Sequence, residues 1–385
     1  MKFLPRLPTA LAAAAIVVFS PPSRALVSLE DGKDHIYVDA SVEMGYDSNL
    51  FANANRTGSI VYQGSLSTEF ARRAGWIGVN GSVVLSYARY GSLQSQDYQD
   101  PKFTLELTKQ TGRTTGSLTV GIQREHREDV TVNTRDVSWN YDVGLNFQYP
   151  VIERYSFSGG LAYSRIDYQD HVLFTDVSTY SGSLYLYYVL SEQRDFFVSY
   201  HTVYTDEASG QYDIDKGLSA GVSGRVYGPF NGSLQFGYES RTPYRSAVDH
   251  GSYNELSASG NATWSINRRM NLTADLSRDF QTTATADSIE ATKAGLTFQD
   301  SFTSKASTTL AGDVGENRFL GVEGLIRPGG PRRVDTFLSF DASYFYTLNP
   351  HLKFSINYVY YLSYSTLAYA EFPRHQVNVS LSSHW

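Results

Sequence analysis

Apolar and polar residues alternate one by one along many stretches of this chain. In residues 352–362 most even positions are large and apolar, as at Leu352 and Ile356, whereas odd positions such as Lys353 are mostly polar. The same alternation returns in 36–44, 137–149 and 256–266. Successive side chains of a β-strand point to opposite faces of the sheet, so this period of two predicts strands with one apolar and one polar face.

The whole set of alternating segments predicts about 18 strands, or 16 if one hairpin is wrongly divided, and bacterial barrels have even numbers. We place the strands at residues 35–46, 59–72, 75–90, 101–110, 114–128, 134–149, 152–168, 176–191, 193–206, 212–227, 229–242, 251–267, 269–281, 287–302, 304–316, 332–348, 350–364 and 372–385. Tight connections, such as 71–75, 110–113 and 150–153, alternate with longer polar ones. Short periplasmic turns and longer external loops are expected in this order.

These features predict an all-β protein, a transmembrane antiparallel up-and-down β-barrel with both mature termini in the periplasm. Beyond residue 25 no apolar run approaches the roughly 18 residues that a membrane-spanning helix needs. A soluble β-sandwich or propeller also alternates, and it stays open as an alternative. The polar face is rich in Ser, Thr, Asn and Gly, however, which suits a wet lumen better than a shared core.

The first 25 residues have the layout of a signal peptide, which predicts export. Lys2 and Arg6 precede an apolar run at 11–19, and Ser23 and Ala25 form a small-x-small cleavage site. We therefore expect residues 26–385 to form a single outer-membrane β-barrel. Removing Lys2, Arg6 and Arg24 from the 32 basic residues leaves 29 against 39 acidic residues, a net charge of −10. Such a surface is not suited to nucleic acid.

Composition adds two points. The chain has 29 Tyr, 21 Phe and 4 Trp, residues that favour strands. It has no cysteine, and its histidines show no metal-ligand spacing, so no cofactor or metal is expected. His126 and Glu125 are the least implausible catalytic pair, and we do not expect an enzyme.

The chain ends in a strand whose last residue is aromatic. Trp385 follows Leu381, Val379 and Val377 on one face. This pattern resembles the C-terminal signature that the barrel assembly machinery reads, although phenylalanine is the usual last residue there. Trp385 is the expected assembly signal, and the machinery and outer-membrane lipid are the expected partners.

The segment Met44-Gly45-Tyr46-Asp47-Ser48-Asn49-Leu50-Phe51 resembles a signature near the N-terminus of a bacterial family labelled β-barrel porin type 2. Members of that family often resemble proteins encoded beside exopolysaccharide synthesis and export systems. Asp47 and Asn49 are turn formers that can end the strand and fold its loop into the mouth. Alternatively they bind a sugar or a cation at the external rim.

Position parity assigns acidic and aromatic residues to the lumen. The expected lumen acids are Asp39, Glu43, Glu69, Glu106, Asp142, Asp275, Asp335 and Asp341, with Glu239 and Asp279 on the same face. They either favour cations or join the wall together through pairing. The expected lumen aromatics are Tyr37, Tyr185, Tyr187, Tyr227 and Tyr361, which would form a stacking track for sugars.

Three functions follow from these features. The family resemblance implies an outer-membrane channel associated with exopolysaccharide export. The alternative is a general or sugar-selective diffusion porin, with a polysaccharide or sugar as the partner in either case. A non-conducting surface scaffold or adhesin is the third. The loop at 315–333 is rich in Pro and Gly, which favours a mobile external loop over a constriction.

Overall fold

The computed structural model describes residues 27–29, 34–73, 75–129, 133–244, 251–285, 287–320 and 332–385. The expected signal peptide at 1–25 lies outside this part of the chain, as does 321–331, which holds most of the loop predicted at 315–333. No helix within the described ranges is long and apolar enough to cross a membrane.

Nearly all of the described chain is strand. The long strands are β2 (Asp34–Asp47), β3 (Ser59–Arg72), β4 (Gly78–Tyr90), β5 (Tyr98–Lys109), β6 (Thr115–Asp129), β7 (Thr134–Ile152), β8 (Tyr155–Tyr168), β9 (Val177–Ser191), β10 (Arg194–Glu207), β11 (Tyr212–Tyr227), β12 (Phe230–Tyr244), β13 (Tyr253–Ser265), β14 (Met270–Thr282), β15 (Ser288–Asp300), β16 (Ala306–Phe319), β17 (Val334–Asn349), β18 (Leu352–Ser365) and β19 (Phe372–His384). Two 3-10 turns, η2 (Gln94–Gln96) and η3 (Ala368–Ala370), and the short β1 (Val27–Leu29) complete the described elements. Every long strand overlaps a predicted one.

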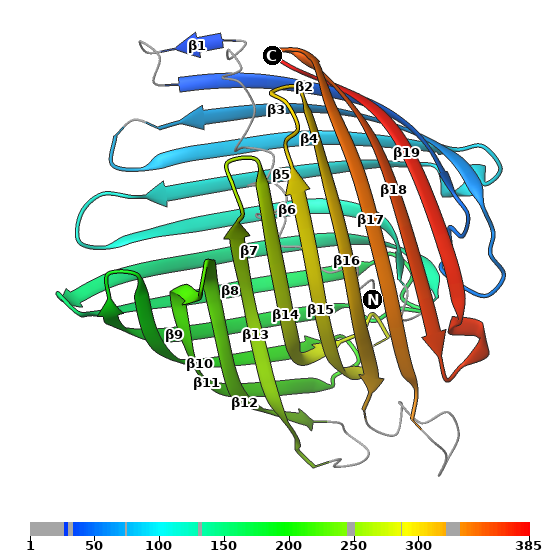
Figure 1. Ribbon diagram of the computed structural model, residues 1–385. Helices are drawn as coiled ribbons and strands as arrows, with labels where there is room; N and C mark the ends of the chain where they lie inside the picture. Colours follow the sequence, from blue (N-terminus) through cyan, green and yellow to red (C-terminus); the bar gives the residue numbers. More distant parts are fainter. Residues whose placement is uncertain are drawn as a thin grey trace.

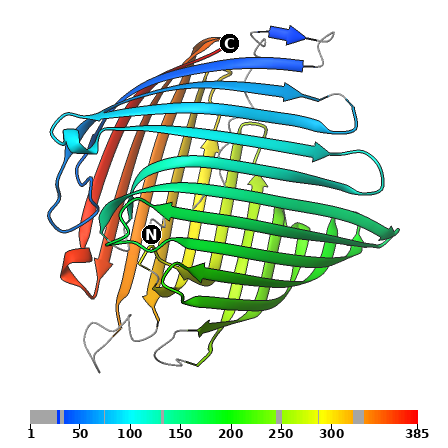
Figure 2. The same ribbon diagram turned by 180° about the vertical axis from the view of Figure 1, so that it is seen from behind.

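The 18 long strands form a closed antiparallel barrel, as the alternation predicts (Figures 1 and 2). Each strand from β2 to β18 pairs with the next, and β19 closes the barrel by pairing with β2 from Gln376↔Asp47 to His384↔Asp39. Trp385 and Val38 extend this closure with two reciprocal backbone hydrogen bonds of 2.9 and 3.0 Å. The short β1, which alternation does not predict, continues the β19 edge along 34–36 of β2.

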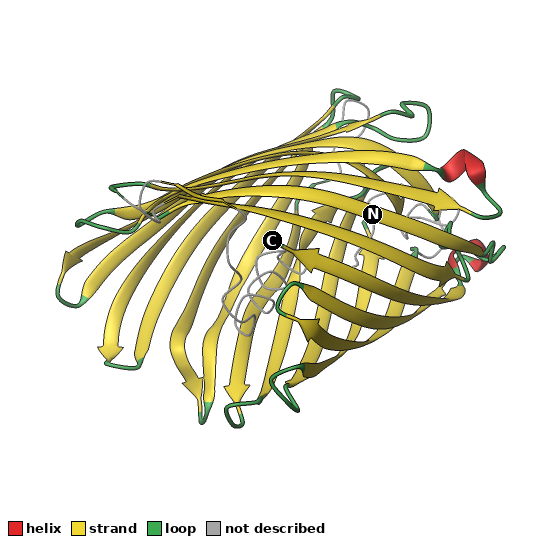
Figure 3. Ribbon diagram, turned by 90° about the horizontal axis from the view of Figure 1, so that it is seen from above, coloured by secondary structure: helices red, strands yellow, loops and turns green. Residues whose placement is uncertain are grey.

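The two ends of the barrel differ in their connections. At one end, here called the turn end, the strands are joined by short connections such as 153–154 and 350–351, and β2 begins and β19 ends there. At the other, the loop end, longer connections such as 48–58 and 169–176 join the strands. The view from above shows how steeply the strands tilt around the lumen (Figure 3).

The outer face of the barrel is apolar and banded with aromatic rings. Exposed Leu, Val, Ile and Phe side chains alternate along nearly every strand. Toward the loop end, five outward tyrosines on β8 to β12 form a row with ring centroids 4.6 to 6.1 Å apart: Tyr163, Tyr180, Tyr204, Tyr212 and Tyr244. At the turn end Tyr155 meets Tyr188, and Phe230 meets Trp264. Aromatic girdles flanking an apolar band are typical of membrane barrels.

Candidate functional site

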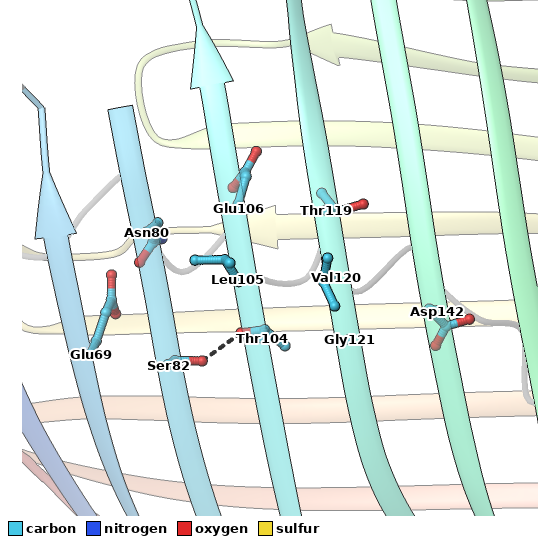
Figure 4. Close-up of a pocket in the computed structure, with 10 residues that line it drawn as sticks. All are labelled: Glu69, Asn80, Ser82, Thr104, Leu105, Glu106, Thr119, Val120, Gly121 and Asp142. Atoms are coloured by element: carbon cyan, nitrogen blue, oxygen red, sulfur yellow. Dashed lines mark hydrogen bonds between the residues drawn. The ribbon is translucent and has the colours of Figure 1, made fainter. Parts of the chain in front are cut away.

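The inner wall from β3 to β7 holds three of the predicted lumen acids beside one hollow. Glu69, Glu106 and Asp142 line a cavity of about 310 Å³, together with Asn80, Ser82 and Thr119 (Figure 4). Register explains the grouping, because Glu69 is opposite Ser82 and Glu106 is opposite Asn80 and Thr119. Within the described chain, Glu69 and Glu106 have neither a salt bridge nor a hydrogen bond. The wall here is acidic and rich in hydroxyl groups, and the charges of Glu69 and Glu106 are not compensated by a neighbouring base in the described chain.

The other predicted acids are inward as well, and most of them have partners. Asp39 accepts hydrogen bonds from Ser67 Oγ at 3.2 Å and from the His384 imidazole. Asp341 accepts from Ser343 Oγ and Asn357 Nδ2, at 3.0 and 2.8 Å. These two carboxylates therefore bond to neighbouring residues of the barrel wall and do not form part of a ring of free carboxylates.

On β14 to β16, Asp275 lies near an ion pair between Lys293 Nζ and Asp313, 2.8 Å apart. A Cβ on Gly295 would lie 2.4 Å from Asp313 Oδ1 and 2.8 Å from Asp275 Oδ2, so glycine leaves the space for both carboxylates. Glu43 lies inward on β2, between Ser380 of β19 and Gln63 of β3 in the ladder.

Four of the five predicted lumen aromatics face inward, in three separate groups. Tyr185 and Tyr187 pack around Phe197, with centroids 5.8 and 5.4 Å from it. Tyr37 stacks on the His384 ring at 5.2 Å near the turn end. Tyr361 lies at the loop end. The groups do not form one continuous row.

Tyr227 is the exception, and its prediction as a lumen residue is wrong. It is opposite Phe230, whose ring meets the outward Trp264, so Tyr227 is on the outer face, where 79% of it is exposed. A β-bulge between Arg225 and Tyr227 adds one residue to β11 and reverses the parity. Gly224 enters this bulge with φ +93°, a conformation that residues with a Cβ rarely adopt.

The rim motif is buried and bonded internally. Asp47 is 4% exposed and forms a two-pronged ion pair with Arg374 of β19, with Arg374 Nε 2.9 Å from Asp47 Oδ1. It also accepts from Gln376 Nε2 at 3.0 Å and from the Asn49 amide at 2.9 Å. Asn49, fully buried, donates its Nδ2 to Asn53 O at 2.7 Å. This is the geometry of a motif that folds its loop into the mouth, the first of the two interpretations above.

The loop 48–58 that follows lies inside the barrel. Leu50 is 2% exposed and packs against Val61, Ala88 and Tyr90 on the inner face of β3 and β4. Ala52 is fully buried among Phe337, Tyr361 and Phe372 on the inner faces of β17, β18 and β19. Two residues of one loop thus hold opposite sides of a six-strand arc.

A second element reaches the same loop from across the lumen. Asn133, between β6 and β7, donates its Nδ2 to Ala52 O at 2.8 Å and accepts from Arg333 Nη2 at 3.3 Å. Arg333 is held by Asp335 at 2.7 Å and lies over the Phe319 ring at 4.3 Å. We call Asp47, Asn133, Arg333, Asp335 and Arg374, with loop 48–58, the mouth latch. The predicted lumen acid Asp335 belongs to it.

Residues 283–285, which follow β14, cross the lumen at another place. Ala284, 1% exposed, packs against Tyr168 and Phe174, and its carbonyl accepts from the Thr175 amide at 3.0 Å. Beside this crossing is a cavity of about 670 Å³ lined by residues of β6 and of β8 to β17, among them Tyr185, His201, Arg241 and Lys293. Contacts therefore bridge the loop end at two places, whereas the acidic hollow lies nearer the turn end.

The buried arginines near the mouth are not among the lumen residues predicted from the sequence. Arg241 is 2% exposed, holds Asp215 by two bonds of 2.7 Å, and donates to Gln281 O at 2.7 Å. Parity alone could have placed Arg241 and Arg374 inward, since they share a face with Glu239 and Gln376.

His126, considered with Glu125 as a catalytic pair, is bound instead to Asp100, with Nδ1 2.7 Å from Oδ1. Across the described ranges, no group of three or more His, Cys, Asp or Glu side chains is placed to hold a metal.

Comparison with known proteins finds the fold and no close relative. No family model matches the chain, and no curated protein matches it. Among solved structures, OccAB2 of Acinetobacter baumannii aligns with a TM-score of 0.50 at 10% identity over 93% of this chain and 99% of that one. The chain has the fold of outer-membrane porins.

Two further structures agree with this assignment of the fold. OccAB3 of Acinetobacter baumannii has a TM-score of 0.50 at 10% identity, covering 91% of this chain and 99% of its own. OccK2 (OpdF) of Pseudomonas aeruginosa has a TM-score of 0.50 at 9% identity, covering 91% and 97%. At sequence identities this low, the structural similarity shows only that the fold is shared. The exopolysaccharide association implied by residues 44–51 receives no support from these comparisons.

Proposed function

We propose that this protein is a diffusion channel of the outer membrane that passes small polar solutes and prefers cations. The observation that carries the proposal is the hollow lined by the carboxylates of Glu69 and Glu106, inside a closed barrel whose outer face is apolar. Carboxylates without counter-ions lower the energy of a cation beside them and raise that of an anion. In this proposal, outer-membrane lipid contacts the apolar outer face of the barrel.

The mouth latch argues for small solutes over a polymer. Loop 48–58 and residues 283–285 both occupy the lumen near the loop end, and each is held by buried contacts. A polysaccharide chain would need both displaced at once. The diffusion porin, which was the alternative in the sequence analysis, is therefore our main proposal. Exopolysaccharide export is supported only by the motif at residues 44–51.

Sugars are a reasonable solute class within this proposal. Tyr185, which lines the larger cavity, and its neighbour Tyr187 offer aromatic faces on which a sugar ring can stack. Liposome swelling with sugars of graded size would measure this directly. We expect monosaccharides to enter and long oligosaccharides to be excluded.

Planar-bilayer recording tests the channel itself. Purified protein should give discrete conductance steps, and a KCl gradient should give a reversal potential on the cation-selective side. Insertion is verified separately by protease protection in liposomes. Protein that inserts without conducting would overturn the channel proposal in favour of a scaffold or adhesin, and an anion-selective reversal potential would overturn the role of the acids.

A further inference from the structure

The barrel wall is not continuous between β13 and β14. Their pairing runs only from Ala258↔Arg278 to Ser265↔Asn271. Residues 253–257 of β13 pair solely with β12, and residues 279–282 of β14 pair solely with β15. Both strands therefore continue toward the loop end for four or five residues without backbone pairing between them, which leaves a wedge in the ladder that the Glu255–Arg278 ion pair bridges at 3.6 Å. We call this wedge the seam.

At the seam, β14 turns inward while β13 stays in the wall. Phe280 shares the outward parity of Leu276, yet it is 7% exposed, and Arg241 of the inner face of β12 lies over its ring at 5.3 Å. Arg241 also donates to Gln281 O of β14, passing over β13. Leu256, on the β13 side, is 73% exposed. The outer face of β14 is thus packed against the inner face of β12.

The larger cavity reaches the seam. Its lining includes Ser257 and Ala258 of β13 and consecutive residues of β14 from Ser277 to Thr282. The ends of β13 and β14 that do not pair with each other therefore lie at the border of the cavity.

The height of the seam matches a membrane boundary. A tilted strand spans the hydrocarbon with about 9–11 residues. Counted from the turn end of each strand, about 9–11 residues reach 255–257 on β13 and 278–280 on β14, the base of the seam. Unpaired backbone groups are tolerated there because they can meet lipid headgroups and water, unlike groups in the hydrocarbon core.

We propose that the seam is a lateral entrance through which single-chain amphiphiles of the adjoining leaflet reach the lumen cavity. The tail stays in the leaflet beside Leu256, and the polar head enters among the hydroxyl and charged groups near Ser257 and Arg278. Only a molecule with both parts is stable at a border between hydrocarbon and a wet, charged cavity. The proposal rests on the barrel spanning a bilayer and not on conduction from end to end.

Cysteine labelling in proteoliposomes tests the seam, because the native chain has no cysteine. The test variant is Ser257→Cys at the seam. The control is Ser219→Cys, which lines the same cavity on β11 and has paired neighbours on both sides. The probe is N-dodecylmaleimide held in the bilayer, compared with water-soluble N-ethylmaleimide.

We expect N-dodecylmaleimide to label S257C at least tenfold faster than S219C, and sodium decanoate to slow labelling of S257C by both reagents. Equal labelling of the two variants by the lipid probe would overturn the proposal, as would its failure to label S257C. Resistance to SDS at room temperature verifies that each variant folds. Conductance, recorded on the same samples, is expected to persist, so a failed seam and a failed channel give different results.

Discussion

The two halves of the lumen use charge in opposite ways. Near the loop end, the carboxylates of Asp47, Asp215 and Asp335 are buried and each holds an arginine within 3 Å. On the β3 to β5 wall, Glu69 and Glu106 face the hollow without such partners. All of these residues are carboxylates, and they differ in whether a basic side chain lies beside them.

This difference separates structural from electrostatic roles. A buried, paired carboxylate contributes to the fold and little to the field in the lumen, because its arginine cancels its charge. An uncompensated carboxylate on a wet wall contributes little to stability but acts on every ion that passes. We therefore expect substitutions in the loop-end half to change stability and mouth geometry, and substitutions in the acidic hollow to change selectivity alone.

Arg241→Ala should have the largest effect on stability. It leaves Asp215 and Asp213 buried without their guanidinium, and breaking a buried pair costs about 3–5 kcal/mol. The matched control is Arg225→Ala at the turn end, whose guanidinium is exposed and bonded to Gln193, and which should cost within about 1 kcal/mol. Urea unfolding in detergent or liposomes measures both. Equal losses would break the comparison.

Asp47→Ala should open the mouth. It removes the ion pair to Arg374 and the cap on the Asn49 amide, so loop 48–58 loses its charged anchor at β19 and keeps only the Ser48 and Ala52 contacts there. We expect about 2–3 kcal/mol of destabilisation, less than for Arg241 because loop 48–58 can rearrange and rehydrate Arg374. We also expect a larger and noisier single-channel conductance. Asp39→Asn, at the turn end, should leave conductance steps unchanged. A smaller conductance in D47A would contradict the latch.

Trp385→Ala sharpens the comparison at the turn end. Trp385 stacks on His351 with centroids 4.2 Å apart, and an aromatic contact of this kind adds about 1 kcal/mol. Trp385→Phe should retain most of it. If Trp385 is also the assembly signal, W385A should fold more slowly on the assembly machinery in vivo while refolding normally in detergent. Equal slowing in both settings would leave only the packing role.

The double variant Glu69→Gln and Glu106→Gln should have the smallest energetic effect. Stability should stay within about 0.5 kcal/mol, as for surface changes. The cation-to-anion permeability ratio, measured from reversal potentials in a KCl gradient, should fall about twofold, and more at low salt because screening weakens. The control E316Q/D206N removes the same charge from the outer face. An equal loss of selectivity there would refute the role of the hollow.

Period-two alternation predicts the strands, their count and most inward positions, because each strand reports its own two faces. It fails at Tyr227, where one bulge reverses the faces and no residue type marks the extra position. It also does not predict the seam, because β13 and β14 both remain extended strands after their pairing stops. The latch cannot be predicted for another reason: Arg374 meets Asp47 only when β19 closes the barrel against β2, and Arg333 meets Asn133 only across the lumen. Local pattern carries no information on either contact.

The pair between Asp47 and Arg374 joins residues 327 positions apart in the chain. Contacts of such sequence separation form late, because a long loop must close before they contribute. Arg374 belongs to β19, the strand that completes the ring with β2. Until that strand arrives, loop 48–58 has no anchor at the β19 edge. Closure of the wall by β19 and anchoring of loop 48–58 through Asp47 are therefore coupled, and a barrel in which β19 is not yet paired lacks this anchor.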